Sequence, residues 1–210
     1  MNKKWLSLLE IIILFLIILA YIWIICPLQN QDLAYLGLFF ILGLVSLSSI
    51  FHKKTLKAIG FRWDNLVDSL KTVGTFTLVC ILIVVICGAF FGSLEFNSRF
   101  IPDFLFYLVW AFLQQYTFQT FFNLRFSEIL EKRFTSVLAT SLVFSSMHFP
   151  NPFLMPATLG VGFFWFWSYL KNPNLFVIAF SHALLGTMVR YTLPSFITYN
   201  MKVGTLYWLH

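Results

Sequence analysis

Long apolar runs, separated by short polar segments, dominate the hydropathy pattern of the chain. A helix needs about 20 apolar residues to cross the hydrocarbon core of a bilayer, and seven runs approach or reach that length. They cover residues 5–26, 33–51, 72–94, 104–126, 135–149, 153–170 and 175–191. The pattern predicts an all-α fold, a polytopic transmembrane helical bundle of about seven spans, with one membrane domain over residues 1–210.

Two less apolar segments interrupt or follow these runs. Residues 52–71 alternate basic and apolar positions, and four of the apolar ones fall on one helical face: Leu56, Ile59, Leu66 and Leu70. This spacing predicts an amphipathic stretch on the anionic cytoplasmic leaflet, with an ordinary cytoplasmic loop as the alternative. Residues 192–210 are mixed, and we expect them to lie at the membrane interface.

Composition supports a membrane protein. The 210 residues are 60% hydrophobic and only 10% charged, whereas a soluble domain carries about 25% charged residues. The net charge of +6 does not indicate nucleic-acid binding, because the basic residues cluster between apolar runs. With seven spans, eleven of the fourteen basic residues fall on the N-terminal side. This bias predicts an integral membrane protein with its N-terminus in the cytoplasm. We expect it to lie in a bacterial cytoplasmic membrane, surrounded by membrane lipid.

The run at 104–126 carries an unusual number of amides. Gln115, Gln119 and Asn123 recur at i, i+4 and i+8, which places three carboxamides along one helical stripe, with Gln114 beside it. Polar groups in hydrocarbon usually face the interior of a bundle. Amides that bond helices together are the alternative to a chemical role.

Two later runs each carry a histidine. His148 ends one run, seven residues after Ser141 and three after Ser145, and His182 lies within the last run. No third strong ligand accompanies the two imidazoles, and a catalytic zinc site normally has three protein ligands, so we expect no metal and no cofactor. A serine hydrolase is also disfavoured, because the only clear carboxylate within a span is Glu10.

The order of these polar residues resembles the CAAX-protease and bacteriocin-processing family (CPBP, or Abi-like) of intramembrane endopeptidases. The family pattern begins with Glu-Glu-x-x-x-Arg on one helix, where this chain has Gln114-Gln115-x-x-x-Gln119. The second motif, Phe-x-x-x-His, is intact as Phe144-Ser-Ser-Met-His148. The first motif has therefore lost its charges while the second is complete.

The third family motif is His followed four residues later by Asn or Asp. Here it is His182-Ala-Leu-Leu-Gly186, which keeps the histidine and loses the last side chain. The resemblance covers residues 104–190, which we take as the protease-like core. Exchanging the motif-one acids and arginine together for amides avoids leaving one buried charge unpaired.

The resemblance implies roles for these residues. In the family, a motif-one glutamate and the motif-two histidine activate water, and the later histidine stabilises an oxyanion. Carried over, His148 would hold water and His182 would donate to the oxyanion, while Gln114, Gln115 and Gln119 occupy the places of the charged residues. An amide does not take a proton from water near neutral pH. We also expect a substrate to contact three neighbouring residues: Asn123, Phe144 and Ser145.

Three functions follow as hypotheses. The first is an endopeptidase with altered chemistry, in which His148 is the base and an amide positions water, acting on membrane-associated peptides or lipidated proteins. The second is a catalytically inactive pseudoprotease that binds or chaperones such substrates. The third is a transporter or channel lined by the amides. The sequence does not favour it, because it shows none of the internal repeats and broken helices typical of transporters.

Overall fold

The computed structural model describes residues 3–208, and every regular element in that range is helical, which confirms the all-α fold. Residues 209–210, at the end of the predicted interfacial tail, lie outside the described residues. Within the described residues, four helices are long and apolar enough to cross a membrane: Lys4–Leu28, Gln31–Phe51, Leu66–Phe91 and Leu175–Thr192. An integral membrane protein is thereby supported, and the number of seven spans stays a prediction.

Contacts divide the chain into two compact units. The first unit contains the N-terminal part up to Lys54, Thr117–Trp167 and the chain from Lys202 onwards. The second unit contains Thr55–Tyr116 and Ser168–Met201. The protease-like core predicted at residues 104–190 contributes to both units, which are described separately below.

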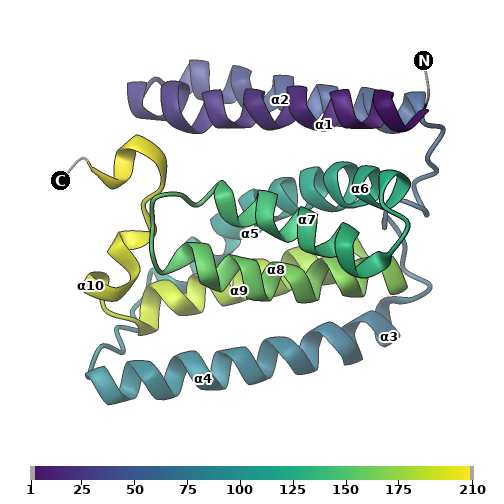
Figure 1. Ribbon diagram of the computed structural model, residues 1–210. Coiled ribbons are helices and arrows are strands. Elements are labelled where there is room, and N and C mark those ends of the chain that lie inside the picture. The colour runs from purple at the N-terminus through teal and green to yellow at the C-terminus, as the bar shows by residue number, and fades with distance from the viewer. Residues whose placement is uncertain (1–2, 209–210) are drawn as a thin grey trace. The chain divides into compact units, whose positions relative to one another are not determined.

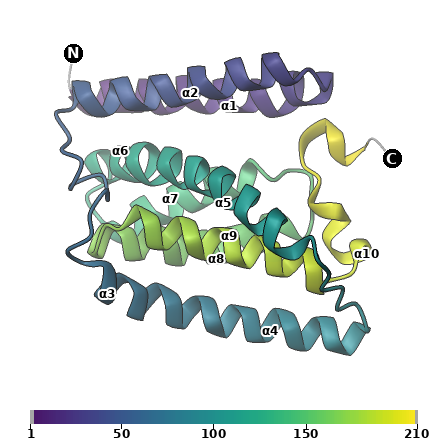
Figure 2. The same ribbon diagram turned by 180° about the vertical axis from the view of Figure 1, so that it is seen from behind.

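The first unit begins with a helical hairpin. Figures 1 and 2 show its two long helices side by side, joined by a turn in which Gln29 adopts a left-handed φ of 53°. The Asn30 side chain caps the second helix by accepting a hydrogen bond from the Leu33 amide, at 3.0 Å. The elements of the unit are α1 (Lys3–Ala20), η1 (Tyr21–Ile25), η2 (Cys26–Leu28), α2 (Gln31–Phe51), η4 (Phe118–Asn123), α6 (Leu124–Ile129), α7 (Arg133–Ser146), most of α8 (Leu154–Lys171) and η6 (Gly204–Tyr207).

Aromatic rings form the core beneath α7. Phe144 packs edge-on against Phe118 and Phe166, with ring centroids 4.8 and 5.7 Å apart. Phe122 stacks on Phe118 at 5.0 Å. Gly162 of α8 faces this group, and a Cβ there would lie 3.0 Å from the Phe144 ring. The core therefore fixes the part of α7 that leads to His148.

A buried charged cluster joins α1, α2 and α6. Arg125 is completely buried, and its guanidinium bonds to Glu10 at 2.9 Å and to the Ser48 hydroxyl at 2.8 Å. It also lies 3.4 Å from Glu128. His52 lies between the two carboxylates, 3.3 Å from Glu10 and 3.7 Å from Glu128. These five residues, the Arg125 cluster, connect helices that are far apart in sequence.

The second unit contains the buried span α9 and its neighbours. α4 packs along α9, as Figure 1 shows. The two helices approach so closely that a Cβ at Gly88 would overlap the Thr192 carbonyl. The elements are α3 (Leu66–Ser69), η3 (Leu70–Gly74), α4 (Thr75–Phe91), α5 (Phe100–Thr117), α9 (Leu175–Thr192), α10 (Ser195–Thr198) and η5 (Tyr199–Met201).

The segment predicted to be amphipathic is folded mainly as turns. Residues 52–65 contain no helix of at least four residues, and α3, which begins at Leu66, opens the long helix that continues into α4. Asn174 caps α9 by accepting from the Val177 amide, and its own amide donates to Asn65 at 2.8 Å. This asparagine pair fastens the end of the turn segment to the start of α9.

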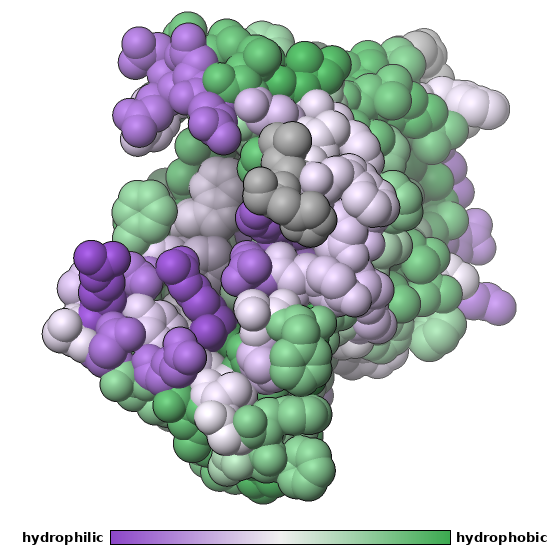
Figure 3. Space-filling view, turned by 90° about the vertical axis from the view of Figure 1, so that its left-hand side faces the viewer, coloured by the Kyte–Doolittle hydropathy of each residue, from purple (hydrophilic) through white to green (hydrophobic). Residues whose placement is uncertain are grey.

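The candidate spans differ in burial. Only 17% of the most apolar window is buried in each of the first three, whereas 67% is buried in α9. Figure 3 shows many hydrophobic residues exposed at the surface, beside patches of hydrophilic ones. Exposed apolar side chains suit contact with lipid tails, while the buried α9 is suited to hold an internal polar site.

Removing the arginine of the charged cluster should destabilise the protein strongly. Arg125→Ala removes the guanidinium that pairs with the Glu10 and Glu128 carboxylates, and breaking a buried ion pair costs about 3–5 kcal/mol. Thermal unfolding in detergent measures the loss. The exposed Arg99 provides the control, and Arg99→Ala should leave the unfolding temperature nearly unchanged. Equal effects of the two substitutions would contradict this role of the cluster.

Stability should fall in acid through Glu128. Burial raises the pKa of Glu128, but the hydrogen bond from Lys54 and the positive charges of Arg125 and His52 outweigh it, so the pKa in the folded protein lies below its ordinary value of 4.5. A lowered folded-state pKa stabilises the protein above the unfolded pKa, and this contribution is lost as the pH falls through the folded value. Unfolding temperatures measured from pH 6 downwards should therefore drop in acid, and Glu128→Gln should reduce that drop. If the unfolding temperature of Glu128→Gln falls in acid as steeply as that of the natural protein, this contribution of Glu128 is refuted.

Candidate functional site

Gln115 of α5 and His182 of α9 meet in the interior of the second unit. Gln115 is completely buried and His182 is 5% exposed. The amide Nε2 of Gln115 lies 3.1 Å from Nδ1 of the imidazole. The hydroxyl of Tyr107, two helical turns earlier on α5, lies 3.3 Å from Nε2 of the same ring. The helices α5 and α9, which are far apart in sequence, thus contribute three polar side chains that form one hydrogen-bonded chain.

The atoms in this chain fix the direction of its hydrogen bonds. An amide nitrogen only donates, so Gln115 donates to Nδ1 of His182. Nδ1 then carries the lone pair, the ring is neutral, and its hydrogen is on Nε2, which donates to the Tyr107 oxygen. The Tyr107 hydroxyl hydrogen takes no part in these two bonds.

Tyr107 also occupies the space next to Gly186, one turn after His182 on α9. A Cβ built at Gly186 would overlap the Tyr107 ring and lie 3.0 Å from its hydroxyl. The Tyr107 and His182 rings pack edge-on, with centroids 5.8 Å apart. The side chain missing from the third motif is thus replaced in space by a tyrosine from another helix.

Gln114 directly precedes Gln115, the first residue of this hydrogen-bonded chain. Its side-chain oxygen is an acceptor that remains unused. Its Oε1 is buried and makes no hydrogen bond with any described residue. A buried carbonyl oxygen without a partner is costly, and a ligand donor or a water molecule would satisfy it. Gln114 is therefore a candidate contact for a bound group.

The other amides of the predicted stripe lie in the π-helix η4, within the first unit. Gln119 and Asn123 are fully buried, and the Asn123 amide donates to Gln119 Oε1 at 3.0 Å and to the Phe166 carbonyl at 3.1 Å. The expected contact at i, i+4 is thus present between these two. A π-helix has a wider turn than an α-helix, so the stripe does not continue at one angle from Gln115 onwards. Gln115 bonds across to His182 instead.

His148 follows the end of α7 in the first unit. Its Nδ1 lies 2.9 Å from the Phe144 carbonyl, and a carbonyl only accepts, so Nδ1 donates and Nε2 carries the lone pair when the ring is neutral. Phe144 supports the ring from beneath at 5.0 Å. The Ser145 hydroxyl donates to the Met155 carbonyl at 2.7 Å. The role of Phe144 and Ser145 in substrate binding stays a prediction.

The predicted site residues therefore fall into two groups. Gln114, Gln115 and His182 belong to the second unit, and the remainder belong to the first: Gln119, Asn123, Phe144, Ser145 and His148. None of these eight side chains is a carboxylate. Among residues 3–208, no three histidine, cysteine or acidic residues are grouped to hold a metal ion. What the site offers is neutral hydrogen-bond donors and acceptors together with imidazole lone pairs.

A comparison with protein families gives a match for the part of the sequence that contains the predicted site residues. Residues 104–188 match the family described as type II CAAX prenyl endopeptidase Rce1-like. Over these residues the chain is similar to the Rce1-like CAAX endopeptidases. The matched segment contains all eight predicted site residues, as well as Tyr107 and Gly186. No curated protein and no solved structure gives a significant match.

Sequence reasoning missed Tyr107. The signal was present, because Tyr107 precedes Gln115 by eight residues and so falls on the same helical stripe. Its importance depends on Gly186, which by sequence alone appears only as a lost motif residue. The pairing of the two becomes visible only when α5 and α9 are placed side by side.

A side chain at Gly186 should be tolerated only when Tyr107 is made smaller. Gly186→Ala forces the Cβ into the Tyr107 ring, and overpacking of this kind costs about 1–3 kcal/mol. In a Tyr107→Ala background most of that cost should disappear, which a double-mutant cycle of thermal unfolding measures. Gly160→Ala, in a helical position with open space around it, is the matched control and should be neutral or stabilising. Additive effects of Gly186→Ala and Tyr107→Ala would contradict the proposed packing.

Proposed function

We propose that this CAAX-protease-like membrane protein binds membrane-associated peptides or lipidated proteins without hydrolysing them by glutamate chemistry. The observation that carries the proposal is the neutral chain from Gln115 through His182 to Tyr107. It lies where the family motif would supply an acid. A binding function uses these groups as they stand, since each is a hydrogen-bond donor or acceptor.

The neutral chain favours binding over turnover for a chemical reason. General base catalysis needs a group that takes a proton from water, and it contributes about 10²–10⁴-fold to a rate. The Gln115 amide is not such a base, and the lone pair of His182 Nδ1 is used by that amide. The Tyr107 hydroxyl and the unused Gln114 oxygen remain suited to hold the carbonyl and amide groups of an extended peptide.

One observation favours a second function, an endopeptidase with altered chemistry. The bond from His148 Nδ1 to the Phe144 carbonyl leaves Nε2 as an acceptor. An imidazole oriented in this way is suited to act as a general base. In this alternative an amide positions the water that His148 activates.

A combined binding and cleavage assay separates the two functions. Purified protein in detergent would be mixed with fluorescent prenylated peptides or bacteriocin-leader peptides, and anisotropy and product formation would be followed together. We expect binding with no product from the natural protein, and weaker binding from Tyr107→Phe, by roughly tenfold for the loss of a buried hydrogen bond. Turnover by the unmodified protein that is abolished in His148→Ala would overturn the proposal and establish the endopeptidase.

A gain-of-function variant provides an independent arm of the test. Gln114→Glu combined with Gln119→Arg restores an acid and its partner charge together, as the family motif has them. Appearance of cleavage in the double variant alone would support a fold that retains the substrate site and has lost hydrolysis. Gln31→Glu, an exposed substitution of the same type in α2, is the control and should produce no cleavage.

A further inference from the structure

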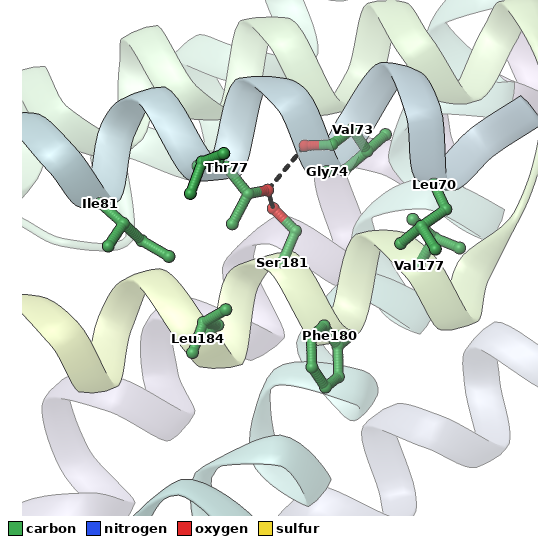
Figure 4. Close-up of a pocket in the computed structure, with 10 residues that line it drawn as sticks. Leu70, Val73, Gly74, Thr77, Ile81, Val177, Phe180, Ser181 and Leu184 are labelled. Carbon is green, nitrogen blue, oxygen red and sulfur yellow. Dashed lines mark hydrogen bonds between the residues drawn. The ribbon is translucent and has the colours of Figure 1, made fainter. Parts of the chain in front are cut away.

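An apolar groove runs between two candidate membrane spans of the second unit. Its volume is about 200 Å³, and its walls come from η3 and α4 on one side and from α9 on the other. Figure 4 shows these walls, with Leu70 and Val177 at one end and Ile81 and Leu184 at the other. The groove is therefore elongated along two helices that hydropathy assigns to the bilayer.

Two hydroxyls form the floor of the groove and satisfy each other. The Thr77 hydroxyl lies 2.7 Å from the Val73 carbonyl and 2.6 Å from the Ser181 hydroxyl, within hydrogen-bond distance of both (Figure 4). Both hydroxyls are thereby used within the protein. Water would find few partners here, and a cavity lined by apolar groups favours an apolar occupant. The groove is suited to a hydrocarbon chain.

The rim of the groove is open. Leu70 is 53% exposed, Leu78 is 58% exposed and Phe180 is 46% exposed, and all three line it. Because they belong to helices that are long and apolar enough to cross the bilayer, the medium at this rim is the hydrocarbon of the lipid tails. A lipid chain can therefore enter sideways from the membrane.

One end of the groove is positively charged. Lys71 lies in η3 between the groove residues Leu70 and Val73 and is exposed. Lys171 is exposed and directly precedes Asn172, whose amide donates to the Ser69 hydroxyl at 3.0 Å, so the backbone of Lys171 lies near the same end. No acidic side chain lies within ion-pair distance of either lysine among residues 3–208.

The other charges at this end leave it basic. Lys57 and Arg62 share Asp64, at 2.8 and 2.6 Å, and the backbone carbonyl of Arg62 is held by the Asn174 amide at the start of α9. Asp68 is the remaining acid, one turn before Lys71. Together with the two lysines above, four positive and two negative side chains give a net charge of +2. Basic residues beside a span attract anionic lipid headgroups.

We propose that this groove is a binding site for an anionic phospholipid, with one acyl chain along the Thr77–Ser181 floor and the phosphate at Lys71. The site is separate from the Gln115–His182–Tyr107 chain and does not depend on the proposed function. An apolar slot and a basic end in line with it match the two parts of one lipid molecule.

Photo-crosslinking in vesicles tests the proposal. The full chain would be reconstituted in phosphatidylcholine containing a little phosphatidylglycerol with a diazirine near the middle of one acyl chain, and adducts would be mapped by mass spectrometry. We expect them to concentrate on the groove residues of α4 and α9. The exposed apolar residues of α1 and α2 in the same sample serve as the internal reference for ordinary surrounding lipid.

Two groups of variants distinguish binding of the acyl chain from binding of the lipid headgroup. Gly74→Leu fills the groove from its wall, where a Cβ meets only Leu70 at 3.6 Å, and should reduce groove adducts to the reference level. Gly43→Leu, in α2 with open space around it, should leave them unchanged. Lys71→Ala should reduce the preference for the phosphatidylglycerol probe over a phosphatidylcholine probe by roughly fivefold.

The experiment still tests the lipid site if Gly74→Leu folds poorly. Ile81→Phe narrows the other end of the groove and replaces Gly74→Leu in that case, with circular dichroism confirming helix content. Adducts spread evenly over all exposed apolar helices, and unchanged in the filled-groove variant, would overturn the site. Groove adducts without a headgroup preference in the natural protein would overturn the anionic assignment.

Discussion

The requirement that buried polar groups find partners governs the main polar contacts of this structure. A bilayer core offers no water to solvate an unpaired donor, acceptor or charge. The fully buried Arg125 is consistent with that requirement, because it is matched by Glu10 and Glu128 and by the Ser48 hydroxyl. The asparagine pair at the start of α9 follows the same rule with neutral groups. Helices that expose most of their residues are thereby held by a few internal polar contacts.

The candidate site meets the requirement without any charge. The family motif pairs acids with an arginine, and here the corresponding positions are amides. Gln115 then needs a neutral partner, which His182 provides, and His182 in turn is satisfied by Tyr107. Gly186 leaves the space in which the tyrosine ring lies. The substitutions at these positions are therefore linked physically: each neutral group is accommodated by the next, and the resulting chain is better suited to binding than to taking a proton from water.

Much of the helical framework could be predicted from the sequence, because long apolar runs specify membrane helices directly. The run at residues 175–191 corresponds to α9 at Leu175–Thr192, and that at 153–170 corresponds to α8 at Leu154–Lys171. The break in the amide stripe was not predictable, since a period of 3.6 residues does not reveal a π-helical turn. Contacts such as Arg125 with Glu10, 115 residues apart, and Tyr107 with His182 depend on which helices become neighbours. The periodicity of apolar and polar residues within one segment does not show which helices become neighbours.

The protonation of His182 tests the central claim most directly, because the neutral chain depends on it. Nitrogen NMR of protein labelled with ¹⁵N-histidine distinguishes the two neutral tautomers from the imidazolium, and loss of a signal in His182→Gln assigns the resonance. The account predicts a neutral ring at pH 7 with its hydrogen on Nε2, and a changed Nδ1 shift when Gln115→Leu removes the donor. An imidazolium, a hydrogen on Nδ1, or a resonance indifferent to Gln115→Leu would contradict it.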